Sequence, residues 1–326
     1  MIISRTPLRI SFFGGGTDYP DWYKFYKGKT IVSTFDKYSY ISLAELEDIY
    51  DYKNRIRYYK REEVDHHNRI KHPTIRNVLK YYKVKKNIDL THVSNFMSNS
   101  GTGSSSAFSV GLINCVHRFL KIKTSPEEIY KDSIYIEQVL NKDAVGSQDQ
   151  VSVACGGFNV INFFKDKIEV QKNILTLNNL KKLQSSCMLF YTGIKRISFN
   201  VTQDVIFNIH KKQKLFENIY STTLLAEKII KKKEIDIKDV GALMDYSWNL
   251  KKKTSNLVTN NLIDAIYKEA KNSGALGGKI LGAGNGGFFL IIAENKNKVK
   301  IINSLKKLRY FPISFTSEGT KIIYED

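Results

Sequence analysis

A glycine-rich loop that runs directly into a helix, between Ser98 and Val110, most restricts how this chain can fold. After three successive serines, apolar residues recur at helical spacing: Leu112, Ile113, Val116, Phe119 and Leu120. The pattern predicts a helix over about 104–120 with the serines in its first turn. The unpaired N–H groups and positive dipole of such a helix end, approached closely over glycines, suit the phosphates of a nucleotide. A serine-rich cap over an ordinary core helix is the alternative interpretation.

Length and composition favour a folded enzyme of ordinary type. A chain of 326 residues can bury a large core and is expected to form two domains. No charged-then-apolar leader opens the chain, and no apolar run approaches the roughly 20 residues needed to cross a bilayer. The three cysteines lie singly, without the spacing of a metal site. We therefore expect a cytoplasmic protein with free thiols and no membrane partner.

The formal net charge of +19 raises the question of a nucleic-acid partner. A basic surface can bind nucleic acid by releasing counterions from its phosphates. Here the lysines are scattered in short runs on otherwise amphipathic segments, and no nucleic-acid-binding motif accompanies them. Solvated helix faces explain most of this charge, and the positive field would help to collect anionic substrates. A basic nucleic-acid-binding protein is kept as a remote alternative.

Periodicity predicts mixed α and β structure. Strands are expected at 1–13, 30–46, 89–97 and 158–164, at a segment ending near 193, and on both sides of a loop within 278–293. Helices are expected at 74–83, 104–120, 125–140, 150–154, 199–231, 237–252, 260–273 and 296–308, the last followed by two short strands. Lysine- and asparagine-rich sequence near 165–185 separates two apolar strands. The predicted domains are therefore 1–175 and 176–326.

Two further glycine clusters accompany the central loop, Gly14-Gly-Gly-Thr-Asp-Tyr19 and Gly282-Ala-Gly-Asn-Gly-Gly287. Three such segments in this order resemble the signature motifs of the GHMP kinases, a superfamily that includes galactokinase and mevalonate kinase. The resemblance covers nearly the whole chain. It implies an α+β fold with an N-terminal ribosomal-protein-S5-like domain and a C-terminal ferredoxin-like domain. It also implies ATP as phosphoryl donor and Mg²⁺ as metal.

The resemblance assigns catalytic roles to two residues. Asp149 matches the aspartate that these kinases place beside the acceptor hydroxyl as a base, and Arg9 matches the basic residue of the first motif that pairs with it. Such a pair would hold Asp149 ionised and bring positive charge to the transferred group. A helix-capping aspartate and a surface arginine at a strand edge are the alternative interpretations.

The resemblance also implies a nucleotide site and a metal site. Ser105 and Glu137 match the Mg²⁺ ligands of mevalonate kinase, and hard oxygen donors of this kind suit that ion. A solvated helix glutamate is the alternative for Glu137. The residues expected to bind ATP are Ser100, Gly101, Thr102, Gly103, Ser104, Ser105 and Ser106.

Acceptor recognition is expected on the first and third motifs and on a basic turn. Asp18 matches the aspartate that accepts hydrogen bonds from sugar hydroxyls in galactokinases, but Gly15 and Gly16 replace the glutamate and histidine found there. Arg196 could bind a phosphate on the acceptor, or could lie in an exposed basic turn. The full predicted acceptor set is Gly15, Gly16, Thr17, Asp18, Arg196, Gly284 and Gly286.

The Gly-Gly-Gly-Thr-Asp form of the first motif resembles that of D-glycero-D-manno-heptose 7-phosphate kinases and bacterial fucokinase-like enzymes. This branch implies ATP-dependent phosphorylation of the anomeric C1 hydroxyl of heptose 7-phosphate. The product, the 1,7-bisphosphate, would serve nucleotide-heptose and surface-polysaccharide synthesis. A kinase of an unphosphorylated sugar such as L-fucose is the alternative within the class. The partners expected are ATP and a small sugar phosphate, and a homodimer is one expectation for the assembly.

Overall fold

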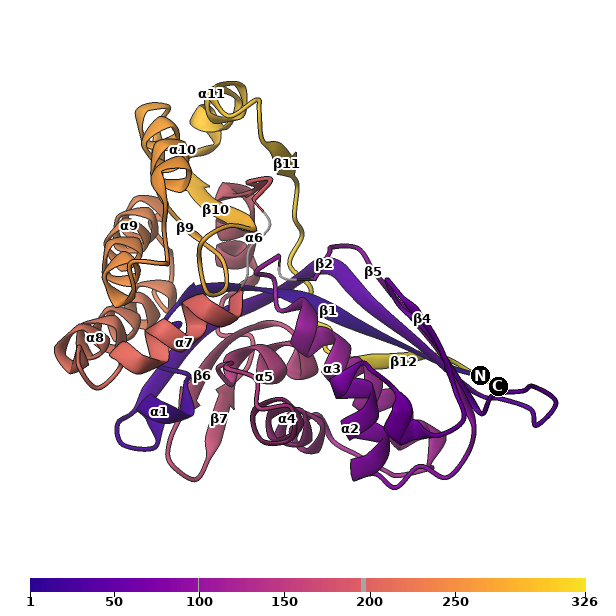
Figure 1. The fold of residues 1–326 in the computed structure, drawn as a ribbon. Coiled ribbons are helices and arrows are strands. Elements are labelled where there is room, and N and C mark those ends of the chain that lie inside the picture. Colours follow the sequence, from indigo (N-terminus) through magenta and orange to yellow (C-terminus); the bar gives the residue numbers. More distant parts are fainter. Residues whose placement is uncertain (99, 195–197) are drawn as a thin grey trace.

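Two β-sheets organise the chain, as the computed structural model shows for residues 1–98, 100–194 and 198–326 (Figure 1). The first sheet has eight strands in the order β12-β1-β2-β5-β3-β4, with β6 pairing β2 and β7 extending from β6. Its strands are β1 (Ile2–Phe13), β2 (Gly28–Glu45), β3 (Asn54–Arg57), β4 (Arg61–Val64), β5 (Ile88–Ser94), β6 (Phe158–Phe163), β7 (Ile168–Gln171) and β12 (Lys321–Glu325). Its central pair, β1 and β2, is almost continuously buried near the site, which explains their apolar runs.

Helices cover one face of this sheet, and the second sheet lies beyond its other face (Figure 1). The helix α3 (Ser104–Phe119), buried from Ser106 to His117, packs on β1 and β2, and α5 (Gln148–Cys155) packs beside it on the same strands. The other helices of this half are α1 (Pro20–Tyr23), α2 (Pro73–Tyr81) and α4 (Pro126–Tyr135). A capping box at Ser125 and Glu128 fixes the start of α4, as its sequence predicts.

The second sheet is antiparallel and has the order β11-β8-β10-β9. It contains β8 (Cys187–Tyr191), β9 (Ala275–Ile280), β10 (Phe288–Ala293) and β11 (Arg309–Phe311). The helices of this half are α6 (Leu177–Ser186), α7 (Ser198–Asn208), α8 (Gln213–Ile230), α9 (Ile237–Thr254), α10 (Asn261–Asn272) and α11 (Lys298–Ser304). The backbone of α9 lies against β9 so closely that a Cβ on Gly277 would stand 2.0 Å from the carbonyl oxygen of Gly241. This contact holds the N-terminal part of α9 beside β9, the strand that leads into the third glycine motif.

Several predicted elements differ from the structure. The single helix expected at 199–231 is two helices, α7 and α8, because the turn between them is anchored to the end of α9. The Asn208 amide donates to the carbonyl of Thr254 at 3.1 Å, and the Lys212 ammonium donates to that of Lys253 at 2.8 Å. The helix expected at 125–140 ends as a π-helical turn over Ile136–Leu140, and the one at 296–308 is shortened to α11.

The sheets separate between β7 and β8, close to the predicted boundary at 175. The chain then returns at its far end, where β12 pairs antiparallel with β1 and brings the two ends side by side (Figure 1). The division into domains at 1–175 and 176–326 stays a prediction. In the structure the last strand, β12, belongs to the first sheet. Among the described residues, none of the helices has the length and apolar character needed to span a membrane.

Candidate active site

A pocket lies where the three glycine motifs meet, between the first sheet and the end of α9. Segments far apart in sequence line it, including the start of α3, the loop before α5, and residues of α7, α9 and β9. Many of the predicted site residues line this pocket: Arg9, Gly15, Gly16, Asp18, Gly101, Gly103, Ser104, Ser105, Ser106 and Asp149. The fold therefore brings the predicted catalytic, nucleotide and acceptor residues to one place.

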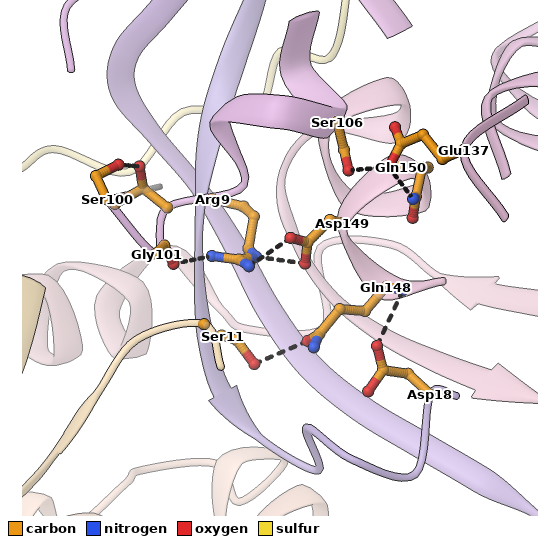
Figure 2. Close-up of polar contacts among 12 residues, drawn as sticks. Arg9, Ser11, Asp18, Ser100, Gly101, Ser106, Glu137, Gln148, Asp149 and Gln150 are labelled. Atoms are coloured by element: carbon orange, nitrogen blue, oxygen red, sulfur yellow. Dashed lines mark hydrogen bonds and ion pairs between the residues drawn. The ribbon is translucent and has the colours of Figure 1, made fainter. Parts of the chain in front are cut away.

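Arg9 and Asp149 form a two-pronged ion pair at the centre of the pocket (Figure 2). The guanidinium Nε donates to Oδ1 of Asp149 at 2.7 Å, and one terminal nitrogen donates to Oδ2 at 2.5 Å. The other terminal nitrogen donates to the carbonyl of Gly101 at 2.5 Å. Arg9 is buried within β1, whereas the side chain of Asp149, in the first turn of α5, keeps 23% of its surface exposed. The arginine thus links the carboxylate to the glycine-rich loop, and the carboxylate stays open to the pocket.

The glycine-rich loop reaches α3 through backbone that only glycine adopts readily. Gly103 is left-handed at φ +72° and forms the N-cap of α3. A Cβ at this position would approach Cγ of Arg9 to 2.9 Å. The first-turn N–H groups of α3 lack partners within the helix and open toward the pocket beside Ser104, Ser105 and Ser106. The geometry is that of an anion-binding helix end.

Glu137 lies behind the serines, buried in the π-helical turn. Its carboxylate accepts hydrogen bonds from Ser106 at 3.1 Å and from the amide of Gln150 at 2.8 Å (Figure 2). It also accepts one from Ser133 at 3.2 Å. Burial raises the pKa of Glu137 to about 7. Of the three successive serines at the start of α3, Ser106 is the one that contacts Glu137. Ser105 is exposed and lines the pocket.

Asp18 fixes the first motif against the loop before α5. Its carboxylate accepts from the backbone N–H of Gly16 at 2.9 Å and of Gln148 at 3.3 Å. A Cβ on Gly146 would stand 2.0 Å from this carboxylate, so glycine is required there. Burial raises the pKa of Asp18 to about 6. Thr17, by contrast, donates to the carbonyls of Gly14 and Lys29, so it stabilises the loop and does not line the pocket.

The third motif packs against the second. The N–H of Phe288 donates to the carbonyl of Ser100 at 3.0 Å, which joins the two glycine loops. Gly282 and Ala283 line the pocket, whereas Gly284 and Gly286 lie behind them, close to Val258 and Ile194 respectively. Ser100 and Thr102 bond to each other at 2.8 Å beneath the loop. Arg196 lies outside the described residues.

Sequence reasoning missed several polar residues of the pocket. Lys279 and Lys251 line it, as do Ser11 and Gln148, which bond to each other at 2.8 Å (Figure 2). Lys279 could have been found, because it is the one charged residue in the strand segment Ala275–Ile280. A lysine in a strand that is otherwise apolar or glycine demands a partner or a function.

Comparisons with known proteins agree with this architecture. Residues 68–157 match the model of the GHMP kinases N terminal domain, and residues 225–308 match that of the GHMP kinases C terminal domain. The chain is 30% identical to the D-glycero-alpha-D-manno-heptose 7-phosphate kinase of Campylobacter jejuni, and the match covers 98% of each protein.

Solved structures give the same result at the level of the fold. The crystal structure of a D-glycero-D-manno-heptose 1-phosphate kinase from Bacteroides thetaiotaomicron superposes with a TM-score of 0.81 over 100% of both chains, at 20% identity. A putative sugar kinase from Campylobacter jejuni superposes with a TM-score of 0.71 over 98% of this chain and 97% of that one, at 26% identity.

The fold and the pocket therefore define a phosphotransferase of the sugar-kinase type. The chain belongs to the GHMP kinases, which confirms the family and the α+β fold predicted from the three motifs. Membership of this kinase family implies ATP as a substrate.

Proposed function

We propose that this kinase transfers the γ-phosphoryl group of ATP to the anomeric C1 hydroxyl of D-glycero-D-manno-heptose 7-phosphate. The observation that carries the proposal is the Arg9–Asp149 pair, which stands in one pocket with the glycine-rich helix start and Asp18. The acceptor is inferred from the Campylobacter jejuni relative, whose name specifies heptose 7-phosphate in its α form. The product would be the 1,7-bisphosphate, a precursor for nucleotide-heptose and surface polysaccharide.

In this proposal Asp149 accepts the proton of the acceptor hydroxyl. The hydroxyl oxygen attacks the γ-phosphorus of ATP, and ADP leaves. Both carboxylate oxygens already accept from Arg9, but a carboxylate has about four lone-pair sites, so about two remain and one of them can accept from the substrate. Arg9 holds the carboxylate in place and brings positive charge close to the phosphoryl oxygens. The start of α3 positions the triphosphate through its N–H groups.

The residues beside the cradle suit Mg²⁺. This ion usually takes one or two protein oxygens and completes its octahedron with water and substrate phosphates. Glu137 supplies a carboxylate, and serine hydroxyls lie between it and the pocket. The buried Oε1 of Gln150 has no hydrogen-bond partner in the described part of the chain and could accept from a metal-bound water. When bound, the ion would neutralise charge on the β- and γ-phosphates.

Three substitutions test the assignment of the Mg²⁺ ligands. Glu137→Gln should weaken Mg²⁺-dependent nucleotide binding by about 10- to 100-fold, as loss of a ligating or supporting group does. Ser105→Ala tests the direct ligand expected from the sequence, and Ser106→Ala tests the hydroxyl that contacts Glu137. Calorimetric titration of nucleotide at several Mg²⁺ concentrations measures the effect.

Ser4→Ala is the matched control for this experiment. Ser4 is also buried, and its hydroxyl donates to the carbonyl of Gly111, on α3, at 2.9 Å, but it does not line the pocket. Its Mg²⁺ dependence should equal that of the wild type. An unchanged Mg²⁺ dependence in Glu137→Gln would remove Glu137 from the metal site.

The acceptor itself is tested by a substrate panel. We expect ATP turnover with D-glycero-D-manno-heptose 7-phosphate to exceed turnover with the unphosphorylated heptose, galactose, L-fucose and mevalonate, because a second phosphate offers charge-assisted contacts. NMR of the product should place the new phosphate on C1. Arg196→Ala should raise the KM for the phosphorylated acceptor and leave that for ATP nearly unchanged.

Two outcomes would contradict the proposed acceptor. Equal use of phosphorylated and unphosphorylated heptose would show that the acceptor phosphate is not recognised. Preferential turnover of L-fucose would favour the fucokinase-like alternative, with the same pocket and the same catalytic pair.

A further inference from the structure

Lys279 is a buried lysine whose role the Arg9–Asp149 pair does not cover. It lies in β9 with 4% of its surface exposed, and it lines the pocket together with Arg9 and Asp18. Its ammonium nitrogen donates to the carbonyl of Phe12, in β1, at 3.1 Å. Among the described residues no carboxylate forms an ion pair or hydrogen bond with it. Buried lysines without a charged partner are costly, so this position is one where a function is expected.

The charges around Lys279 oppose each other. Burial and the neighbouring Arg9 lower the pKa of Lys279 to about 7, and Asp18 acts in the opposite direction. Asp18 is itself buried, and its pKa is raised. From α9, the ammonium of Lys251 also reaches this region, where it donates to the carbonyls of Ile280 and Gly282 at 2.9 Å and 2.5 Å. The lining of the pocket is thus rich in positive groups, which disfavours a further positive charge.

Substrate binding would reverse this balance. The triphosphate and the acceptor phosphate bring several negative charges into the pocket that Lys279 lines. An opposite charge within about 4–6 Å favours the charged form of a lysine. Arg9 reaches the glycine-rich loop, and Asp18 belongs to the acceptor side, so a group acted on by both lies between the two substrates.

We propose that Lys279 is a second cation of the phosphoryl-transfer site, which takes up a proton from solvent when the anionic substrates bind and then donates to the phosphoryl oxygens. The step is a proton uptake alone: the neutral amine and one proton give the ammonium, and no covalent bond to the substrate forms. The inference rests on the proposed function, because it requires that the pocket holds the transferred phosphoryl group. It assigns to β9, the strand that leads into the third motif, a direct part in binding that group.

Proton uptake can be measured directly. Titration calorimetry of a non-hydrolysable ATP analogue with Mg²⁺, in two buffers of different ionisation enthalpy that both buffer at the chosen pH (Hepes and Tris at pH 8, Mes and Bis-Tris at pH 6), gives the number of protons exchanged from the difference in heat. At pH 8, above the lowered pKa of Lys279, most of this lysine is neutral before binding, so the wild type should take up more protons than Lys279→Met, with one proton as the upper limit of the difference. At pH 6 Lys279 already carries its proton, so the difference between the two proteins should vanish.

Lys298→Met is the matched control. Burial also lowers the pKa of Lys298, and its ammonium also donates to a backbone carbonyl, that of Ser185 at 2.8 Å, but on α11 outside the pocket. Its proton uptake should equal that of the wild type at both pH values. Lys279→Gln provides a second neutral variant if the methionine variant is poorly folded.

The outcomes separate this inference from the proposed function. Equal proton uptake by wild type and Lys279→Met at pH 8, in a protein that phosphorylates heptose 7-phosphate, would overturn the inference alone. Uptake that depends on Lys279, in a protein that turns over none of the sugars tested, would support the inference and overturn the proposed acceptor. A difference between wild type and Lys279→Met that is as large at pH 6 as at pH 8 would overturn the inference as well.

Discussion

Asp149→Asn should lower kcat by roughly 10²- to 10⁴-fold, the range expected for loss of a general base. The amide keeps the shape of the carboxylate but does not accept a proton, and it replaces one of the two acceptors that face Arg9 with a donor. Nucleotide binding should change little, because the cradle at the start of α3 is built from backbone groups. Single-turnover kinetics with saturating ATP and acceptor measure the chemical step.

Asp143→Asn controls for the loss of a carboxylate nearby. Asp143 lies on the connection before α5 and accepts from the amide of Asn141 at 3.1 Å, but it does not line the pocket. Its kcat should stay within about threefold of the wild type, as expected for a polar change away from the reacting groups. Near-normal turnover in Asp149→Asn would make Asp149 a helix-capping residue and would require another base.

Arg9→Met should affect both catalysis and stability. Loss of a preorganised positive group at the transferred phosphoryl should lower kcat by about 10²- to 10³-fold. The same change leaves Asp149 and the carbonyl of Gly101 without their shared donor, and breaking a buried pair in this way costs on the order of 3 kcal/mol. Urea unfolding and steady-state kinetics on the same preparation measure the two effects.

Arg9→Lys and a double variant distinguish charge from geometry. Lysine keeps the positive charge but loses the planar fork that bonds Asp149 at two points, so kcat should fall between wild type and Arg9→Met. Because the two residues act as a unit, Arg9→Met combined with Asp149→Asn should lower kcat far less than the product of the single effects. Additive losses would show that Arg9 and Asp149 act separately.

Much of the fold was accessible from sequence because its signals are local. The helix α3 begins where glycine gives way to serine and apolar spacing starts, and the structure confirms it at Ser104–Phe119. The break between α7 and α8 was missed, because it depends on bonds to Lys253 and Thr254, which lie far along the chain. The short strand β4, Arg-Glu-Glu-Val, was missed because its charged residues give no apolar alternation.

The site was predictable to the extent that motifs reveal it. The resemblance to GHMP kinases identified Arg9, Asp18 and Asp149, and the structure places them in one pocket, although their roles stay predictions. Three successive serines do not reveal which one contacts Glu137, because each step along a helix turns the side chain by about 100°. Which serine contacts Glu137 depends on how α3 packs against the π-helical turn, and in the structure it is Ser106.

Because β12 pairs with β1, the sheet that carries Arg9 is completed only when the last strand has been synthesised. Residues of β1 leave the ribosome first, yet one flank of that strand is paired only when Lys321–Glu325 follow. Until then the segment Ile2–Arg5 of β1, the strand that carries Arg9 further along, presents an open edge that can pair with other chains. Domains commonly fold as units from the N-terminal end during translation. Here the first half can be completed only after the second has been made, so the nascent enzyme should acquire its finished catalytic strand late and depend on protection until it does.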